Sequence, residues 1–166
     1  MAELPIYYFA YGSNLNRADM LVRCPGAKPL TTAELAGWRL TFRGVADIEP
    51  RVGLTVPGAL WRLTGPDLRA LDRYEGAPHL YGRRPVAVDT ETGPLEAIAY
   101  VMTGDDYPGL PSAWYFERIA QGYRDWGLPR AELASALRTT REELARRGVT
   151  ATAGLPSSTN AERPRG

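Results

Sequence analysis

The sequence predicts an α+β fold built on one mixed sheet. Segments rich in β-branched and aromatic residues dominate the middle of the chain, and helical patterns are inserted between them or follow them. Strands and helices do not alternate strictly, which argues against a doubly wound α/β fold. We therefore expect a mixed sheet that can curl into a barrel with helices around it, although periodicity alone does not predict closure.

The first element is a strand over residues 5–11, which is apolar on both faces and is therefore expected at the centre of the sheet. A short helix follows over residues 16–23. Pro25 and Gly26 end it, because proline cannot continue a helix and glycine favours the conformation that terminates one.

Two further strands are expected in AELAGWRLTFRG (33–44) and LTVPGALWRLT (54–64). Between them lies GVADIEPRVG (44–53), whose glycine and proline content predicts an irregular loop.

The segment TGPDLRALDRYEG carries the sequence signals of a short helix over residues 64–76. Thr64 can cap its N-terminus, Pro66 stands in the first turn, and Asp67 follows the cap by three residues. Gly76 is placed to end the helix.

A hairpin and two helices complete the expected order. LYGRRPVAVDT (80–90) and LEAIAYVMT (95–103) are strands joined by the turn ETGP. From Ser112 the pattern is helical, and Gly127 and Pro129 close this helix. A second helix spans about 130–147 and ends at Gly148. The apolar stripe of the first helix is Phe116, Ile119, Tyr123 and Trp126, and that of the second is Leu133, Leu137 and Leu144.

Residues 1–148 are expected to form one domain, and no internal repeat is visible. The segment TATAGLPSSTNAERPRG has few large apolar side chains, so residues 149–166 are predicted to be a disordered tail.

Composition excludes several classes of function. The 166 residues carry 20 basic and 19 acidic side chains, a net charge of +1, and the arginines are dispersed, which does not fit a nucleic-acid-binding protein. No apolar run is long enough to span a membrane, and MAELPIYYF has a glutamate where a signal peptide carries basic residues. A single cysteine, Cys24, excludes an internal disulfide. We expect a cytoplasmic protein.

One charged residue stands on an apolar stripe. Leu68, Leu71 and Glu75 fall at i, i+3 and i+7 of the helix over 64–76, so the Glu75 carboxylate is aimed toward the core. Burial raises the pKa of a carboxyl toward neutrality, as a general acid/base requires. Alternatively, Glu75 reaches water at a frayed helix end or pairs with a nearby cation: Arg73, Arg83 or Arg84. Asp72, which can bond Arg69 or a backbone N–H, is assigned a structural role.

Near the N-terminus, YFAYGSNL shows a strand that breaks into Gly12, Ser13 and Asn14. These residue types favour a turn, but a strand that stops at glycine and enters a helix also presents backbone N–H groups to an anion. Metal and nucleotide motifs such as HExxH and GxGxxG are absent. Cys24 and His79 can be counted as a nucleophilic pair, but nothing around Cys24 activates a thiol.

Three segments in order resemble the γ-glutamylcyclotransferase family, also described as the AIG2-like or butirosin-deprotecting cyclotransferase group: YFAYGSNL, LDRYEG, and YVMTGDDYPGLPSAWYFERIAQGYRDWGLP. Together they cover about residues 6–137. The resemblance implies a small barrel with a cavity, and no metal or cofactor.

The resemblance also implies roles for single residues. The YGSN loop would hold the α-carboxylate and α-amine of a γ-glutamyl group through backbone contacts, and Glu75 would be the acid/base. The residues implied to bind substrate are Tyr8, Tyr11, Gly12, Ser13, Asn14, Tyr81 and Tyr115.

Three functions remain open on these residues. The first is an enzyme that releases 5-oxoproline and a free amine from a small γ-glutamyl amide. The second is a binding module without chemistry, against which Glu75 argues. The third is an amidase or transferase that passes the γ-glutamyl group to water or to another amine. The product distinguishes them, because only the first yields 5-oxoproline.

Overall fold

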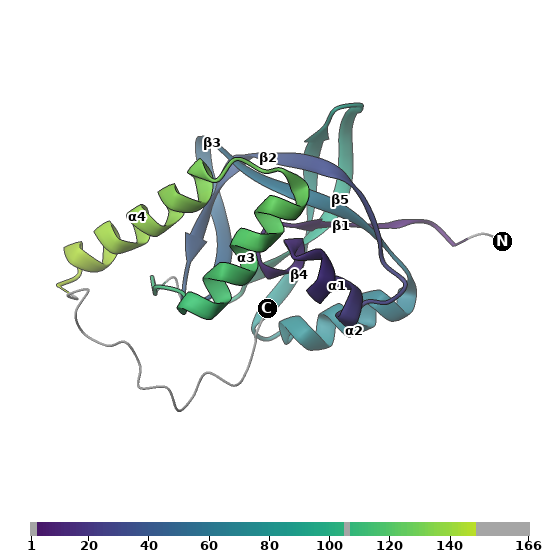
Figure 1. The fold of residues 1–166 in the computed structure, drawn as a ribbon, viewed down its shortest axis with the longest axis horizontal. Helices are drawn as coiled ribbons and strands as arrows, with labels where there is room; N and C mark the ends of the chain where they lie inside the picture. Colours follow the sequence, from purple (N-terminus) through teal and green to yellow (C-terminus); the bar gives the residue numbers. More distant parts are fainter. Residues whose placement is uncertain (1–2, 105–106, 149–166) are drawn as a thin grey trace.

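The computed structural model describes residues 3–104 and 107–148, and its sheet is a closed five-stranded barrel (Figure 1). The order of strands around the barrel is β1-β3-β2-β4-β5. Four α-helices accompany it within these residues, so both the predicted α+β class and the curled sheet are confirmed. The strands are β1 (Ile6–Ala10), β2 (Lys28–Phe42), β3 (Ala46–Leu63), β4 (Tyr81–Thr90) and β5 (Gly93–Met102).

The barrel closes where β1 meets β5. All other neighbouring strands are antiparallel, whereas β1 and β5 run parallel and pair at Tyr8 and Ile98. On its other side, β1 pairs with β3, where Tyr8 lies opposite Trp61. The predicted hairpin is confirmed, because β4 and β5 pair from Tyr81 opposite Met102 to Thr90 opposite Gly93.

Helix α1 (Arg17–Arg23) follows a single 3₁₀ turn, η1 (Ser13–Leu15). The Asn16 side chain caps α1 by accepting a hydrogen bond from the Asp19 N–H at 3.1 Å. The helix predicted at residues 16–23 is therefore present.

Helix α2 (Gly65–Glu75) begins and ends as its sequence predicts. Thr64 and Asp67 form a reciprocal capping box, in which each side chain accepts from the backbone N–H of the other. Gly76 ends the helix with a φ of 63°, a left-handed conformation that glycine adopts without steric cost.

The two C-terminal helices are α3 (Ala113–Trp126) and α4 (Ala131–Arg146). Their predicted apolar stripes face inward: Ile119, Tyr123 and Leu133 are buried, and the other stripe residues are half-buried. In Figure 1, α1, α2 and α3 gather on one side of the barrel, while α4 packs on β2 and extends outward. An ion pair between Arg39 and Glu143, at 2.7 Å, joins α4 to β2.

The prediction of an irregular loop over residues 44–53 is wrong. Strand β3 already starts at Ala46, and Ala46–Pro50 pairs with Trp38–Phe42 after a turn at Gly44, whose φ is 80°. Pro50 lies beside a register irregularity of β2, where a proline does not break the ladder. Glycine and proline in this segment therefore mark a tight turn and a bulge inside a long hairpin.

Aromatic side chains are the largest groups of the core. Its largest fully buried side chains include Trp61, Tyr81, Tyr100, Tyr123 and Phe9. Cys24 is also buried, and its Sγ lies 3.5 Å from the Asp67 carbonyl oxygen. No helix in the described part of the chain is long and apolar enough to cross a membrane. The tail predicted over 149–166 lies outside the described residues.

Candidate active site

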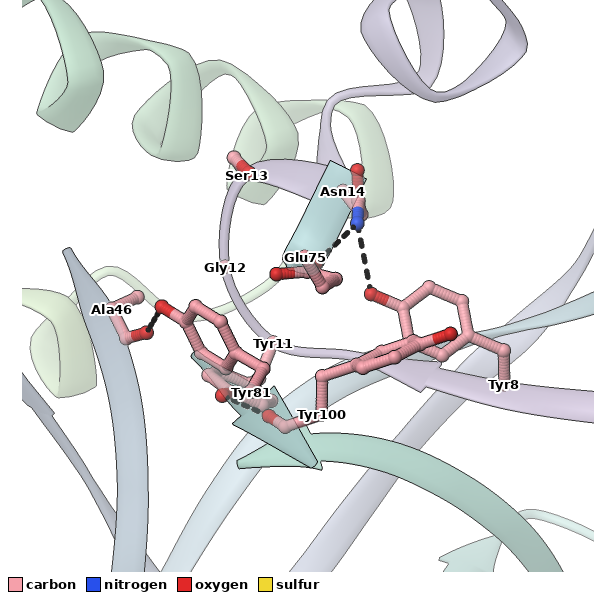
Figure 2. A pocket seen from close by; sticks show the side chains of 9 residues that line it. All are labelled: Tyr8, Tyr11, Gly12, Ser13, Asn14, Ala46, Glu75, Tyr81 and Tyr100. Atoms are coloured by element: carbon pink, nitrogen blue, oxygen red, sulfur yellow. Dashed lines mark hydrogen bonds between the residues drawn. The ribbon is translucent and has the colours of Figure 1, made fainter. Parts of the chain in front are cut away.

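A small pocket collects residues from six elements and the loops beside them (Figure 2). Its empty space, counted together with its open mouth, is about 250 Å³. The YGSN loop forms one wall, and the end of α2 projects toward the loop. The lining residues are Tyr8, Tyr11, Gly12, Ser13, Asn14, Ala46, Glu75, Tyr81 and Tyr100.

Glu75 is the acidic residue of this pocket. Its side chain is buried, because Glu75 occupies the last turn of α2 on the same face as Leu71, and Gly76 then turns the chain away. One oxygen, Oε1, accepts a hydrogen bond from Asn14 Nδ2 at 3.2 Å. The other, Oε2, is buried and has no hydrogen-bond partner in the part of the chain that the structure describes.

The alternative roles for Glu75 do not fit this geometry. The helix is closed at Gly76 and the carboxylate is only 3% exposed, so it does not reach bulk water from a frayed end. Among the residues that the structure describes, Glu75 forms no ion pair with Arg73, Arg83 or Arg84.

Burial raises the pKa of Glu75 from 4.5 to about 8. The positive charge of Arg23 and the hydrogen bond from Asn14 oppose this rise, because both favour the carboxylate form. The net result is a carboxyl group that gains and loses its proton near neutral pH. Such a group can act as acid and as base in one reaction cycle.

Asn14 links three side chains. Its Nδ2 donates to Glu75 Oε1 and, at 3.0 Å, to the Tyr8 hydroxyl. Its Oδ1 accepts from Arg23 Nη1 at 2.7 Å. Both N–H bonds of the Asn14 amide are therefore engaged and its oxygen accepts one hydrogen bond, so the amide fixes the position of Glu75 relative to β1 and α1.

Gly12 is required by close approach and not by its backbone angles. Its φ is −122°, outside the left-handed region. A Cβ at this position would lie 3.1 Å from Ala46 Cβ, tighter than an ordinary contact. The loop passes directly against the start of β3, and this leaves no room for a larger side chain.

The next two residues present polar groups to the pocket. Among the described residues, neither the Ser13 nor the Asn14 N–H donates a hydrogen bond, as is usual for the first N–H groups of a helical turn. The Ser13 hydroxyl is buried, and none of the described residues forms a hydrogen bond with it. It lies near the hydroxyls of Tyr74 and Tyr115 and lowers the pKa of both, which burial raises overall.

Two tyrosines hold the backbone of Ala46. The Tyr81 hydroxyl donates to the Ala46 carbonyl at 2.8 Å, and the Ala46 N–H donates to the Tyr115 hydroxyl at 3.0 Å. Tyr81 lines the pocket, as expected. Tyr115 does not: it lies behind Gly12, with its hydroxyl 3.7 Å from the position of a Gly12 Cβ, and it supports the wall that Ala46 and Gly12 form.

Burial raises the pKa of the lining tyrosines, Tyr8, Tyr11, Tyr81 and Tyr100, above 10. Their hydroxyls therefore stay neutral at physiological pH. Of the nine lining residues, Glu75 is the one whose charge changes near neutrality.

The model of the γ-glutamyl cyclotransferase, AIG2-like family matches residues 8–122, more than half of the chain. The chain belongs to this family. Two relatives, the γ-glutamylcyclotransferases of Bos taurus and Homo sapiens, are each 32% identical to it. The bovine match covers 74% of this chain and 72% of the relative, and the human match covers 76% and 74%. The recognition made from the three sequence motifs is thus confirmed.

A solved structure titled γ-glutamyl cyclotransferase superimposes with a TM-score of 0.69 at 28% identity. It covers 93% of this chain and 95% of the solved chain. A structure of a Homo sapiens protein also has a TM-score of 0.69, at 29% identity, over 94% and 95% of the two chains. The fold likeness therefore includes the residues that match the family model, 8–122, and extends beyond them, and the family is one of enzymes.

Three residues in or beside this candidate site were not predicted. Ala46 fell in the segment read as a loop, and Tyr100 was quoted within a family motif without a role. Arg23 closes α1 and reaches back to Asn14, a contact that no sequence spacing indicates. The predicted partner of Asp72 was also wrong: Asp72 Oδ1 accepts from the Tyr100 hydroxyl at 2.7 Å and lies 3.3 Å from Arg83 Nε.

Proposed function

We propose that this family member releases 5-oxoproline and a free amine from a small γ-glutamyl amide, with Glu75 as general acid/base. One observation carries the proposal: a buried carboxyl of pKa about 8 faces the YGSN loop with one oxygen held and the other free. The printed names of the relatives, γ-glutamylcyclotransferase, support the substrate class.

The substrate's γ-glutamyl end matches the polar groups of the loop. The unbonded N–H groups of Ser13 and Asn14 suit the α-carboxylate, because main-chain donors at the start of a helical turn favour an anion. The α-ammonium then lies toward Glu75. Its positive charge favours the carboxylate form of Glu75, which prepares the base when substrate binds.

The reaction transfers two protons from the α-nitrogen to the departing nitrogen. Glu75 takes one proton from the α-ammonium, and the freed amine attacks the γ-carbonyl carbon to close a five-membered ring. Glu75 returns that proton to the amide nitrogen, and the C–N bond to this nitrogen breaks. The second proton follows by the same route, so the products are 5-oxoproline and an ammonium ion.

No covalent enzyme intermediate is required. The attacking amine and the carbonyl belong to one molecule, so the enzyme contributes orientation of a folded substrate and a proton carrier. The reaction therefore needs no thiol nucleophile. Cys24, whose pKa burial raises to about 12, is not suited to act as one. We further propose that the protein acts in the cytoplasm, without metal, nucleic acid or membrane as partner.

The test is product identity. The purified protein is incubated with γ-glutamyl amino acids, γ-glutamyl alkylamines and γ-glutamyl-capped larger amines, in buffer with and without a chelator. We expect 5-oxoproline in equal molar amount to the released amine, with no effect of the chelator. Free glutamate would indicate an amidase, a new γ-glutamyl compound a transferase, and binding without turnover a module that lacks chemistry.

A further inference from the structure

We infer that Arg23 is a positioning residue for the reaction: it acts through the Asn14 side chain to hold Glu75 with one oxygen bound and the other free. This inference rests on the proposed role of Glu75 as acid/base. Arg23 does not line the pocket and no substrate contact is assigned to it.

The contact between Arg23 and Asn14 decides which way the amide points. Arg23 Nη1 can only donate, so the atom of Asn14 that it meets at 2.7 Å is the acceptor Oδ1. The donor Nδ2 then faces Glu75 Oε1 and the Tyr8 hydroxyl, as Figure 2 shows. Without Arg23 the amide is free to turn, and the turned form sets Oδ1 against the Glu75 carboxylate.

Arg23 is itself held between two helices. It is the last residue of α1, and its guanidinium carbon lies 3.9 Å from the centroid of the Tyr74 ring. Tyr74 directly precedes Glu75 on α2. This cation–π contact places the guanidinium where it reaches Asn14, and it ties the orientation of the amide to the helix that carries the acid/base.

The charge of Arg23 acts on Glu75 without a direct bond. In residues 3–104 and 107–148, neither side chain takes part in an ion pair, and Asn14 stands between them. A direct pair would occupy the carboxylate and remove its raised pKa. With the amide between them, Arg23 lowers the pKa that burial imposes while Oε2 stays unbonded.

The other groups around Glu75 do not supply this effect. Within the described residues, the other titratable groups that interact with Glu75 are tyrosines, which are neutral at physiological pH because burial raises their pKa values. They come from β1 and its loop, α2, β4, β5 and α3: Tyr8, Tyr11, Tyr74, Tyr81, Tyr100 and Tyr115.

The experiment compares Arg23→Met, Arg23→Lys and a matched control, Arg118→Met. Methionine keeps an unbranched apolar side chain beside the Tyr74 ring but removes the donor and the charge, whereas lysine restores a donor and the charge. Arg118, on α3, forms an ion pair with Asp19 of α1, the helix that ends at Arg23. It does not contact Asn14 or Glu75. The Glu75 carboxyl is titrated by ¹³C NMR, with its signal assigned by its loss in Glu75→Gln. kcat and KM for 5-oxoproline release are measured across pH.

We expect Arg23→Met to lower kcat about 10- to 100-fold, as loss of a group that orients a catalytic side chain does. Its Glu75 signal should titrate at higher pH than in the wild type, and KM should change little. Arg23→Lys should recover most of both changes, and Arg118→Met should match the wild type. In the Asn14→Leu background, Arg23→Met should lower kcat much less, because the amide through which it acts is gone.

Unchanged titration and kcat in a folded Arg23→Met would overturn the inference. So would an equal change in Arg118→Met, which would indicate a general loss of α1 packing. If Arg23→Met does not fold, Arg23→Gln replaces it, because glutamine removes the charge and keeps a polar side chain. Its Glu75 signal should titrate at higher pH than in the wild type, and an unchanged titration would overturn the inference. If the wild type forms no 5-oxoproline, the proposed function fails, and the NMR titration still tests whether Arg23 acts on Glu75.

Discussion

Helix α2 carries a buried carboxylate near each end, and the two are held in opposite ways. Asp67 and Glu75 are each 3% exposed. Asp67 accepts three hydrogen bonds, from the Thr64 N–H, the Thr64 hydroxyl and, at 3.2 Å, the Gly26 N–H. Within residues 3–104 and 107–148, Glu75 accepts one hydrogen bond, from Asn14, and its second oxygen accepts none.

Asp67 is a buried carboxylate that stabilises the helix, whereas Glu75 is one whose environment suits proton transfer. Asp67 stands at the N-terminal end of the helix, where backbone N–H groups and the helix dipole favour a negative charge. Glu75 stands at the C-terminal end, where the dipole disfavours it, and its desolvation is only partly compensated. Equal exposure therefore does not mean equal function, and the count of hydrogen bonds distinguishes the two.

The largest effect is expected from Glu75→Gln. The amide has nearly the same shape, so the variant should fold, but it cannot carry a proton, and turnover should fall about 10²–10⁴-fold. The measurement is 5-oxoproline release with a thermal melt as the test of folding. Asp67→Asn is the matched control and should keep kcat per folded molecule. Wild-type turnover by a folded Glu75→Gln protein would remove Glu75 from the mechanism.

The same pair of variants should differ in the pH dependence of stability. The Glu75 carboxyl has a pKa of about 4.5 when unfolded and about 8 in the fold. Between these values the unfolded chain gives up a proton that the folded chain keeps, so the wild type loses stability as pH rises. Glu75→Gln removes this loss, and at pH 8 its free energy of unfolding should exceed that of the wild type by about 1–4 kcal/mol.

Denaturant unfolding at pH 5 and pH 8 measures this difference. The gain of Glu75→Gln over the wild type should be larger at pH 8. Asp67→Asn should instead lower the free energy of unfolding at both pH values, by about 1–2 kcal/mol, because it breaks the capping box. A gain for Glu75→Gln that is the same at both pH values would contradict the raised pKa.

A smaller effect is expected from the loop that faces Glu75. Gly12→Val should weaken binding of 5-oxoproline about 10- to 100-fold, since a Cβ there meets Ala46 Cβ at 3.1 Å and pushes the loop away from the wall. The measurement is calorimetric titration with 5-oxoproline. Gly104→Val is the control, because a Cβ at Gly104 meets nothing within 4 Å. Equal affinities of the two folded variants would mean that the loop is only a turn.

The smallest effect is expected from Ser13→Ala. The hydroxyl has no partner within the described residues, so its removal should leave the melting temperature nearly unchanged. Affinity for a γ-glutamyl analogue should fall at most about tenfold, equal to one hydrogen bond of roughly 0.5–1.5 kcal/mol. A much larger loss with an unchanged melt would show that the side chain, and not the backbone, holds the ligand.

The positions of both carboxylates, Asp67 at the helix cap and Glu75 on the inward face, could be predicted because they depend on residues nearby in the sequence. The cap of α2 is a contact between residues three apart, and the inward aim of Glu75 follows from its spacing to Leu68 and Leu71. The hairpin of β4 and β5 and the stripes of α3 and α4 were predicted for the same reason. In each case the interacting groups lie within one element or one turn.

What the sequence did not predict depends on distant contacts. The backbone of Ala46 is held by Tyr81 and Tyr115, which stand 35 and 69 residues away. Its segment was misread because Gly44 and Pro50 favour a loop locally, whereas pairing with Trp38–Phe42 decides the outcome. The number of hydrogen bonds on Glu75 likewise depends on Asn14, 61 residues away.

Tyr8 belongs both to the barrel seam and to the site. It is the β1 residue that pairs with Ile98 of β5, and its hydroxyl accepts a hydrogen bond from the Asn14 amide beside Glu75. A folding intermediate with both hairpins formed but the seam open would therefore lack a complete site. A ligand that binds only the complete site stabilises the closed barrel in proportion to its concentration over its Kd. A bound product or substrate thus disfavours the separation of β1 from β5, and it stabilises the folded enzyme against unfolding that begins at this seam.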